Sequence, residues 1–184
     1  IILSGISFIF LIVAFSLCLS LANGQDLPKS ILSKLQAEDN SDWKVVWDKQ
    51  TVAAKRLFNA KSKVFTGKPQ DAARGFLTSY HGLFGLTPDL GNLQISESIK
   101  TPLGERVTFR QYHNQIPVMG AEIAVHVSSK NSIFLVENHC IPSITIDTQP
   151  SVEKDDAANT AARALNVDAA RIEKASSELV ILPS

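Results

Sequence analysis

Apolar residues gather first at the N-terminus, where residues 6–21 form a nearly unbroken apolar run and residues 1–24 carry no charge. The small-x-small pattern of residues 22–24 follows, and a signal peptidase can cut such a pattern before Gln25. We therefore expect residues 1–24 to be a secretory signal peptide. A retained membrane anchor is the alternative, but a span normally needs about 20 apolar residues. Because the sequence opens inside apolar residues without Met, we also expect an incomplete N-terminus.

Residues 25–68 are polar, with scattered apolar positions and two tryptophans, Trp43 and Trp47, four residues apart. The apolar residues of 31–35 have helical spacing, and residues 43–47 fit a helix or a strand equally well. We expect this segment to be an irregular lead-in with at most short structure.

A stronger helical pattern begins at Pro69 and Asp71, which are typical of a helix start. Apolar residues then recur at steps of three and four and predict a helix that ends near Gly85. These residues are Ala72, Ala73, Phe76, Leu77, Tyr80 and Phe84.

The period then changes to two, which is typical of strands. Residues 93–99 and 107–111 alternate around a turn at 102–104 and predict a β-hairpin. Residues 116–118 form a short extended piece in which Pro117 cannot donate a ladder hydrogen bond, so it belongs at an edge or a bulge. Residues 123–127 and 133–141 predict two more strands. The pattern thus predicts an antiparallel meander packed on the preceding helix.

A new unit begins at Pro150, with Ser151 as the expected N-cap of a helix whose apolar stripe runs over residues 157–165. Residues 179–182 follow as a strand. Because such a β-α-β unit would end on an unpaired strand edge, we expect it to be truncated.

Charge and cysteine content narrow the possible partners. The chain has 18 basic and 18 acidic residues, so it has no electrostatic signature for nucleic acid or anionic lipid. Cys18 lies in the apolar run, after a bulky Leu17 that is unlike a lipid-attachment site. Signal removal would leave Cys140 alone, which excludes an intrachain disulfide and a thiolate zinc cluster.

Candidate catalytic and metal-binding residues do not form a recognisable pattern. No two of the four histidines, His81, His113, His126 and His139, have the spacing of four that zinc hydrolases use on a helix. Glu122 and His126 on a strand would lie about 13 Å apart. Neighbouring strand residues such as His139 and Cys140 point to opposite faces, which favours a buried thiol beside a surface histidine. We therefore expect no catalytic residue, no metal and no cofactor.

Residues 107–122, Val-Thr-Phe-Arg-Gln-Tyr-His-Asn-Gln-Ile-Pro-Val-Met-Gly-Ala-Glu, resemble the core of the fungalysin/thermolysin propeptide (FTP) motif. The similarity extends over residues 70–183, where the alanine-rich helix is similar to that of a PepSY domain. One departure is Gln115, where the family often has glycine. We expect Gln111 to hydrogen-bond the following turn and Gly120 to allow a bulge or a close approach. The candidate motif residues, structural or at an interface, are Gln111, Ile116, Pro117, Val118, Gly120 and Ala121.

This resemblance implies an α+β fold, in which an FTP-like meander on a helix (69–127) precedes a β-α-β PepSY-like unit (128–184). It also implies the function of a pro-region of a secreted thermolysin-like zinc metalloprotease, which would assist folding of its protease domain and inhibit it. The implied partner is that catalytic domain, with no nucleic acid and no membrane after signal cleavage. A stand-alone secreted inhibitor or binding module is the alternative, and an independent enzyme is the third possibility.

Overall fold

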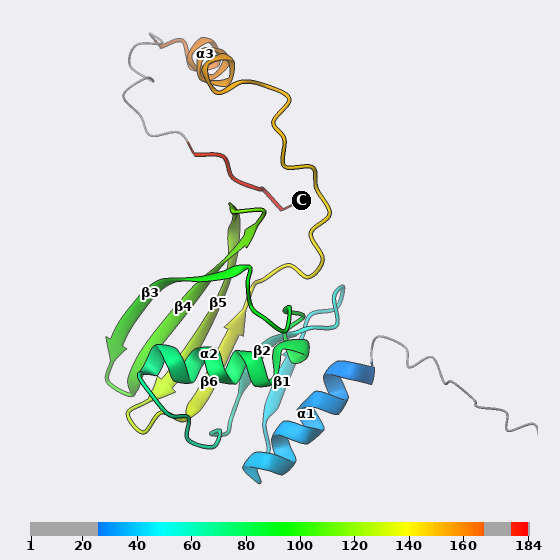
Figure 1. The fold of residues 1–184 in the computed structure, drawn as a ribbon, viewed down its shortest axis with the longest axis vertical. Coiled ribbons are helices and arrows are strands. Elements are labelled where there is room, and N and C mark those ends of the chain that lie inside the picture. Colours follow the sequence, from blue (N-terminus) through cyan, green and yellow to red (C-terminus); the bar gives the residue numbers. More distant parts are fainter. Residues whose placement is uncertain (1–25, 168–177, 184) are drawn as a thin grey trace, which may run out of the picture.

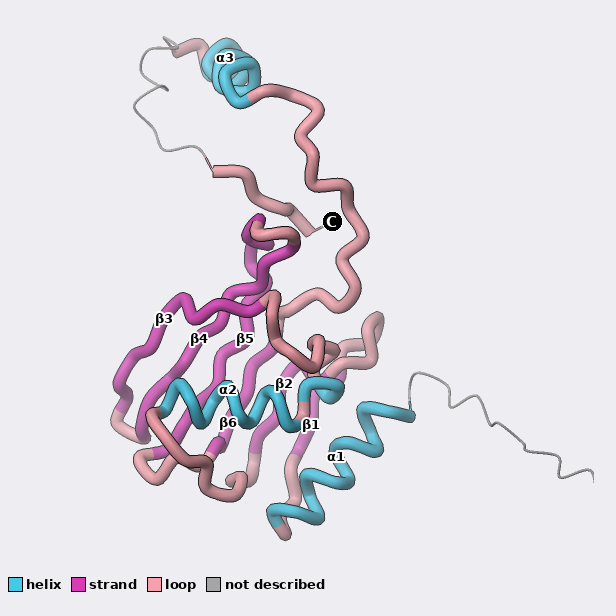
Figure 2. The backbone as a smooth tube through the Cα atoms, in the orientation of Figure 1, coloured by secondary structure: helices cyan, strands magenta, loops and turns pink. Residues whose placement is uncertain are grey.

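The computed structural model describes residues 26–167 and 178–183, so the predicted signal peptide lies outside the described residues. The fold is α+β, as expected: a six-stranded antiparallel sheet carries two helices, α1 and α2, against one face (Figures 1 and 2). The strand order is β1-β2-β6-β5-β4-β3. In chain order the elements are α1 (Asp26–Asp39), β1 (Lys44–Trp47), β2 (Ala54–Phe58), α2 (Pro69–Ser79), the 3-10 helix η1 (His81–Leu83), β3 (Leu93–Thr101), β4 (Gly104–His113), β5 (Ile116–Ser128), β6 (Ile133–Asn138) and α3 (Lys154–Leu165).

The predicted meander is confirmed, because β3, β4, β5 and β6 pair with one another in sequence order. Alternation places one row of residues toward the helices, with Phe109 opposite Ile123 and Val107 opposite Val125. All four side chains are fully buried. The two pieces predicted at 116–118 and 123–127 belong to one long strand, β5.

Helix α2 covers the middle of the sheet, as its apolar spacing predicted. Its buried side chains include Phe76, which contacts the rings of Trp43, Phe65, Tyr80 and Phe84. The α-helix ends at Ser79, and the 3-10 turn η1 continues the helical segment to Leu83. Gly85, at φ +68°, then turns the chain away, because a residue without Cβ adopts this left-handed conformation without strain.

The expectation of an irregular lead-in over residues 25–68 differs from the structure. This segment forms a 14-residue helix, α1, and the hairpin β1–β2, which joins the sheet through β2 and β6. Leu35, Trp43 and Leu57 supply its buried contacts. The elements depend on these few side chains packing on α2 and β6, which lie far along the sequence.

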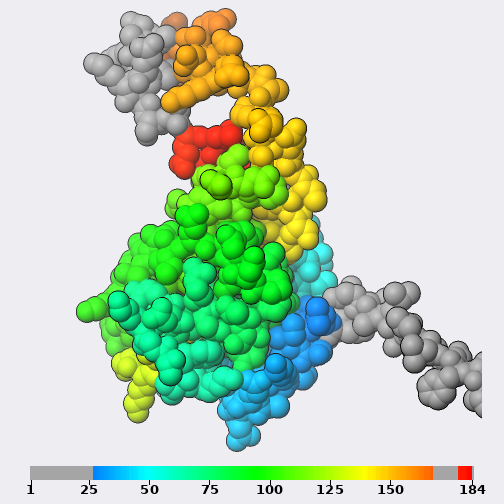
Figure 3. Space-filling view, viewed as in Figure 1, coloured from blue at the N-terminus to red at the C-terminus, as the bar shows by residue number. Residues whose placement is uncertain are grey.

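The C-terminal residues also differ in detail. Strand β6 lies in the same sheet as β5, so the sheet continues across the expected boundary after Val127, and the PepSY-like assignment of residues 128–184 stays a prediction. Helix α3 is confirmed, but its N-cap is Glu153 rather than Ser151. The expected strand at 179–182 is reduced to an isolated parallel bridge between Ile181 and Val118. Figure 3 shows the α3 segment standing beyond the end of the sheet.

Candidate functional site

The turn between β4 and β5 consists of two residues in the left-handed region, Asn114 at φ +48° and Gln115 at φ +66°. A two-residue hairpin turn with both φ angles positive matches the right-handed twist of the paired strands. Glycine fits the second of these positions without strain. Gln115 therefore keeps this type of turn, but it carries a side chain at a position that glycine would occupy without strain.

The side chain of Gln111 connects β4 to the segment that follows β6. Its Nε2 donates to the carbonyl of Ile141 over 2.8 Å, and its Oε1 accepts from the amide of Ile141 over the same distance. Gln111 is only 3% exposed, so little water competes for these bonds. The expectation that Gln111 bonds the following turn was wrong, because its amide pairs with a backbone group 30 residues further along the chain.

The register between β4 and β5 breaks at Gln111. Arg110 pairs with Glu122 and Tyr112 pairs with Pro117, so the stretch Val118–Ala121 lies opposite Gln111 alone. This bulge is the environment that Pro117 was expected to need. Within it, Gly120 has φ +71°, and a Cβ built there would meet no atom within 4 Å. Gly120 thus serves the backbone conformation of the bulge, and the alternative of a close backbone approach is excluded.

The bulge also contacts the end of the described chain. Ile181 donates its amide to the carbonyl of Pro117 over 3.0 Å, and the amide of Met119 donates to the carbonyl of Ile181 over 2.9 Å. The side chains of Val118 and Ala121 are buried, and Ile116 is half-buried beside the turn. All six candidate motif residues therefore lie at one end of the β4–β5 pair.

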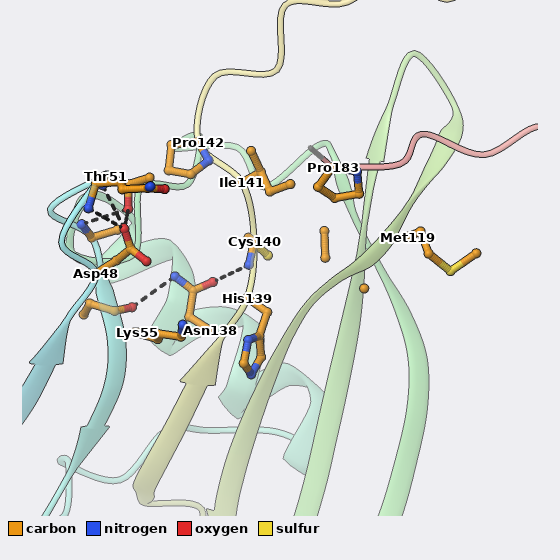
Figure 4. A pocket seen from close by; sticks show the side chains of 15 residues that line it. Asp48, Thr51, Lys55, Met119, Asn138, His139, Cys140, Ile141, Pro142 and Pro183 are labelled. Carbon is orange, nitrogen blue, oxygen red and sulfur yellow. Dashed lines mark hydrogen bonds between the residues drawn. The ribbon is translucent and has the colours of Figure 1, made fainter.

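A pocket of about 390 Å³ opens next to the bulge, between the β1–β2 turn and the residues that follow β6 (Figure 4). Two of its polar side chains, Asp48 and Asn138, are engaged in hydrogen bonds within the protein. Asp48 accepts the amides of Gln50 and Thr51, and the Asp48 pKa is lowered chiefly by the Thr51 amide. Asn138 donates to the carbonyls of Ala54 and Phe84 and accepts from the amide of Cys140. The pocket lining thus consists mainly of groups that hold the fold together.

The Cys140 thiol beside this pocket is free and half-buried, while His139 is exposed. The histidine lies on the surface as interpreted, while the thiol is only half-buried. Burial raises the pKa of the Cys140 thiol to about 12. A thiol in that state is protonated near neutral pH and is a poor nucleophile.

The sheet face opposite α1 and α2 carries ion pairs between neighbouring strands. Arg56 and Glu137 are 3.8 Å apart, and Glu137 also lies 3.5 Å from His126 Nε2. Burial lowers the His126 pKa and outweighs the opposing effect of Glu137. Two further pairs, Arg110–Glu122 at 3.2 Å and Arg106–Glu97 at 3.9 Å, continue the pattern toward β3. This face is therefore largely self-neutralised.

Within residues 26–167 and 178–183, no group of three or more His, Cys, Asp or Glu side chains could hold a metal ion. In the same part of the chain, no helix has both the length and the apolar character that a membrane crossing requires. The hydrogen bonds described at the bulge each join two separate segments of the chain, and each of them involves a backbone group.

Residues 91–139 match the Fungalysin/Thermolysin Propeptide Motif. Over these residues the chain is similar to the FTP family. The match runs from the turn before β3 to His139, just after β6, and includes all six candidate motif residues. The predicted resemblance is confirmed for these residues.

No curated protein is significantly similar to the chain. One solved structure, the Bacillus megaterium YpeB C-terminal domain, aligns at 14% identity with a TM-score of 0.41, covering 73% of this chain and 72% of that chain. A similarity of this size is too low to assign a shared function.

The sequence pattern pointed to the six candidate motif residues but not to the residues they contact. Ile141 and Ile181 contribute backbone groups, and a backbone group has no sequence signature. Asn138 has one weak signal, since a polar residue at an inward position of an apolar strand implies a buried hydrogen-bonding role.

Proposed function

We propose that this chain is the pro-region of a secreted thermolysin-like zinc metalloprotease, where it assists folding of the protease domain and inhibits it. The FTP motif at residues 91–139 is the observation that carries this proposal. The apolar N-terminal run of the sequence supports export, and the proposed partner is the catalytic domain of the same precursor.

The chemistry of the described residues agrees with a binding role. The Cys140 thiol is held protonated, and Asp48 and Asn138 in the neighbouring pocket are bonded to the protein itself. A pro-region needs a stably folded surface rather than a reactive group. The continuous hydrophobic core under α2 stabilises the fold that presents such a surface.

The proposal is tested by refolding the denatured protease domain of the same gene with and without residues 25–184. We expect the chain to raise the yield of active protease and to inhibit the mature protease in a saturable way. The matched control is Phe76→Ala, which removes the ring at the centre of the aromatic contacts and should cost about 3–5 kcal/mol of stability.

Two outcomes would contradict the proposal. An unchanged refolding yield together with tight inhibition would favour a stand-alone inhibitor. Equal assistance by the native chain and by an unfolded Phe76→Ala variant would mean that the effect does not need the folded surface.

A further inference from the structure

After Asn138 the chain leaves the sheet and forms α3 beyond its end, and Ile181 again lies beside the sheet, at Val118 (Figure 1). The 12-residue helix α3 has few contacts that could fix its position, because most of its side chains are exposed and Ala162 is its one buried residue. Leu165, on its apolar stripe, is 69% exposed. Among the described residues between Pro142 and α3, one exposed hydrogen bond reaches the sheet, from Asn114 to the Thr148 hydroxyl over 3.3 Å. The more protected contacts lie at Ile141, before α3, and at Ile181, after it.

The FTP motif holds the departing end. Ile141 is bonded through both its amide and its carbonyl to the buried side-chain amide of Gln111. A primary amide is suited to this contact, since it offers a donor and an acceptor side by side, as a neighbouring strand would.

The FTP motif also holds the returning end. The bulge takes Val118–Ala121 out of register with β4, and the Pro117 carbonyl and the Met119 amide pair with Ile181. Both end contacts thus depend on the same irregularity, since Gln111 is the residue that the bulge leaves without a partner in β5.

We propose that the FTP motif of this chain is a two-point clamp, which holds Ile141 before α3 and Ile181 after it and so fixes the position of α3 relative to the sheet. Gln111 and the Pro117–Met119 backbone are its positioning groups. The two contacts are coupled through the bulge, so loosening one loosens the other. This inference rests on contacts within the chain and stands whether or not the protease assignment holds.

Hydrogen exchange of individual amides tests the coupling in the chain from Gln25 onward. In Gln111→Leu the amide of Ile141 loses its acceptor, and we expect its exchange to accelerate about tenfold, the rate equivalent of one hydrogen bond. Coupling predicts that the amides of Met119 and Ile181, which do not touch Gln111, also accelerate severalfold. The amides of Phe109 and Val125 report on the sheet and should be unchanged.

Two further variants sharpen the test. Gln94→Leu makes the same substitution at an exposed position of β3 and should change none of these amides. Ile181→Pro removes the donor to Pro117, so coupling predicts faster exchange at Ile141. This second variant tests the clamp from the opposite end, even if Gln111→Leu should fail to fold.

The position of α3 is measured separately by spin labels at Lys100→Cys and Arg163→Cys in a Cys140→Ala background. We expect a narrow distance distribution that broadens in Gln111→Leu and in Ile181→Pro. Faster exchange confined to Ile141, with an unchanged distance distribution, would overturn the clamp.

Discussion

At the scale of single residues, the end of the β4–β5 pair relies on left-handed backbone at Asn114, Gln115 and Gly120. The sequence predicted a turn after Gln111 and a bulge as one option for Gly120. It could not separate that option from a close backbone approach, because glycine satisfies both requirements. The open space around Gly120 separates them.

Substitutions at Gly120 are expected to destabilise the protein to different degrees, because its backbone is left-handed. We expect Gly120→Asn to cost least, Gly120→Ala about 1–2 kcal/mol, and Gly120→Val most, since left-handed backbone is hardest for a β-branched residue. Urea melts measure the order. Met119→Val, at the exposed neighbouring position, controls for β-branching alone. Equal midpoints for Gly120→Ala and the native chain would show that the bulge relaxes at no cost.

Glu38 connects α1 to the rest of the molecule. It accepts hydrogen bonds from Lys63 over 2.7 Å and from the Tyr80 hydroxyl over 2.8 Å. The Lys63 contact, followed by that of Tyr80, lowers the Glu38 pKa below its ordinary value of 4.5. A carboxyl whose pKa is lowered by folding stabilises the native state above its unfolded pKa, and this contribution disappears as the pH falls through the folded pKa.

We therefore expect Glu38→Gln to lower the urea midpoint at pH 7, and the difference from the native chain to shrink as the pH falls below about 4.5. Parallel urea melts from pH 7 to pH 3 measure it. Glu97→Gln, on the opposite sheet face, is the control. A difference that stays constant over this range would show that the Glu38 charge contributes nothing.

At the scale of elements, the sequence predicted those elements whose own hydrophobic periodicity is strong. Helix α2 and the β3–β4 hairpin have long periodic sequences and were correctly predicted. The segment α1–β1–β2 was missed because its few apolar side chains, such as Leu35 and Leu57, are informative only when α2 and β6 are present to bury them. The C-terminal strand was predicted from four apolar residues, yet one backbone bridge at Ile181 is what those residues form.

Asn138 joins several of these elements, because its amide group donates to the carbonyl of Ala54, at the start of β2, and to that of Phe84, just after η1. Asn138→Ala would leave both carbonyls and the Cys140 amide buried without a partner. At about 1–3 kcal/mol for an unsatisfied buried group, we expect a loss of about 3 kcal/mol in the free energy of unfolding. Urea melts measure it against Asn159→Ala, an exposed change in α3 that should stay near the native midpoint. A loss below about 0.5 kcal/mol would mean that water replaces the amide.

At the scale of the whole molecule, the two faces of the sheet differ in kind. One is buried under α1 and α2, while the other carries the cross-strand pairs of Arg56, Arg106 and Arg110 with neighbouring glutamates. The sequence predicted the buried face from alternation. It could not predict the pairs, because they depend on the register of strands that are distant in sequence.

The strand order has a consequence for synthesis of the chain. Hairpin β1–β2 is made early, yet its place in the sheet is beside β6, which ends at Asn138. On the ribosome, α1, β1 and β2 emerge while β6 is still untranslated. Their apolar side chains cannot be fully buried until β6 has been made. The order of the strands therefore favours completion of the sheet after β6 has been translated over stepwise folding from the N-terminus.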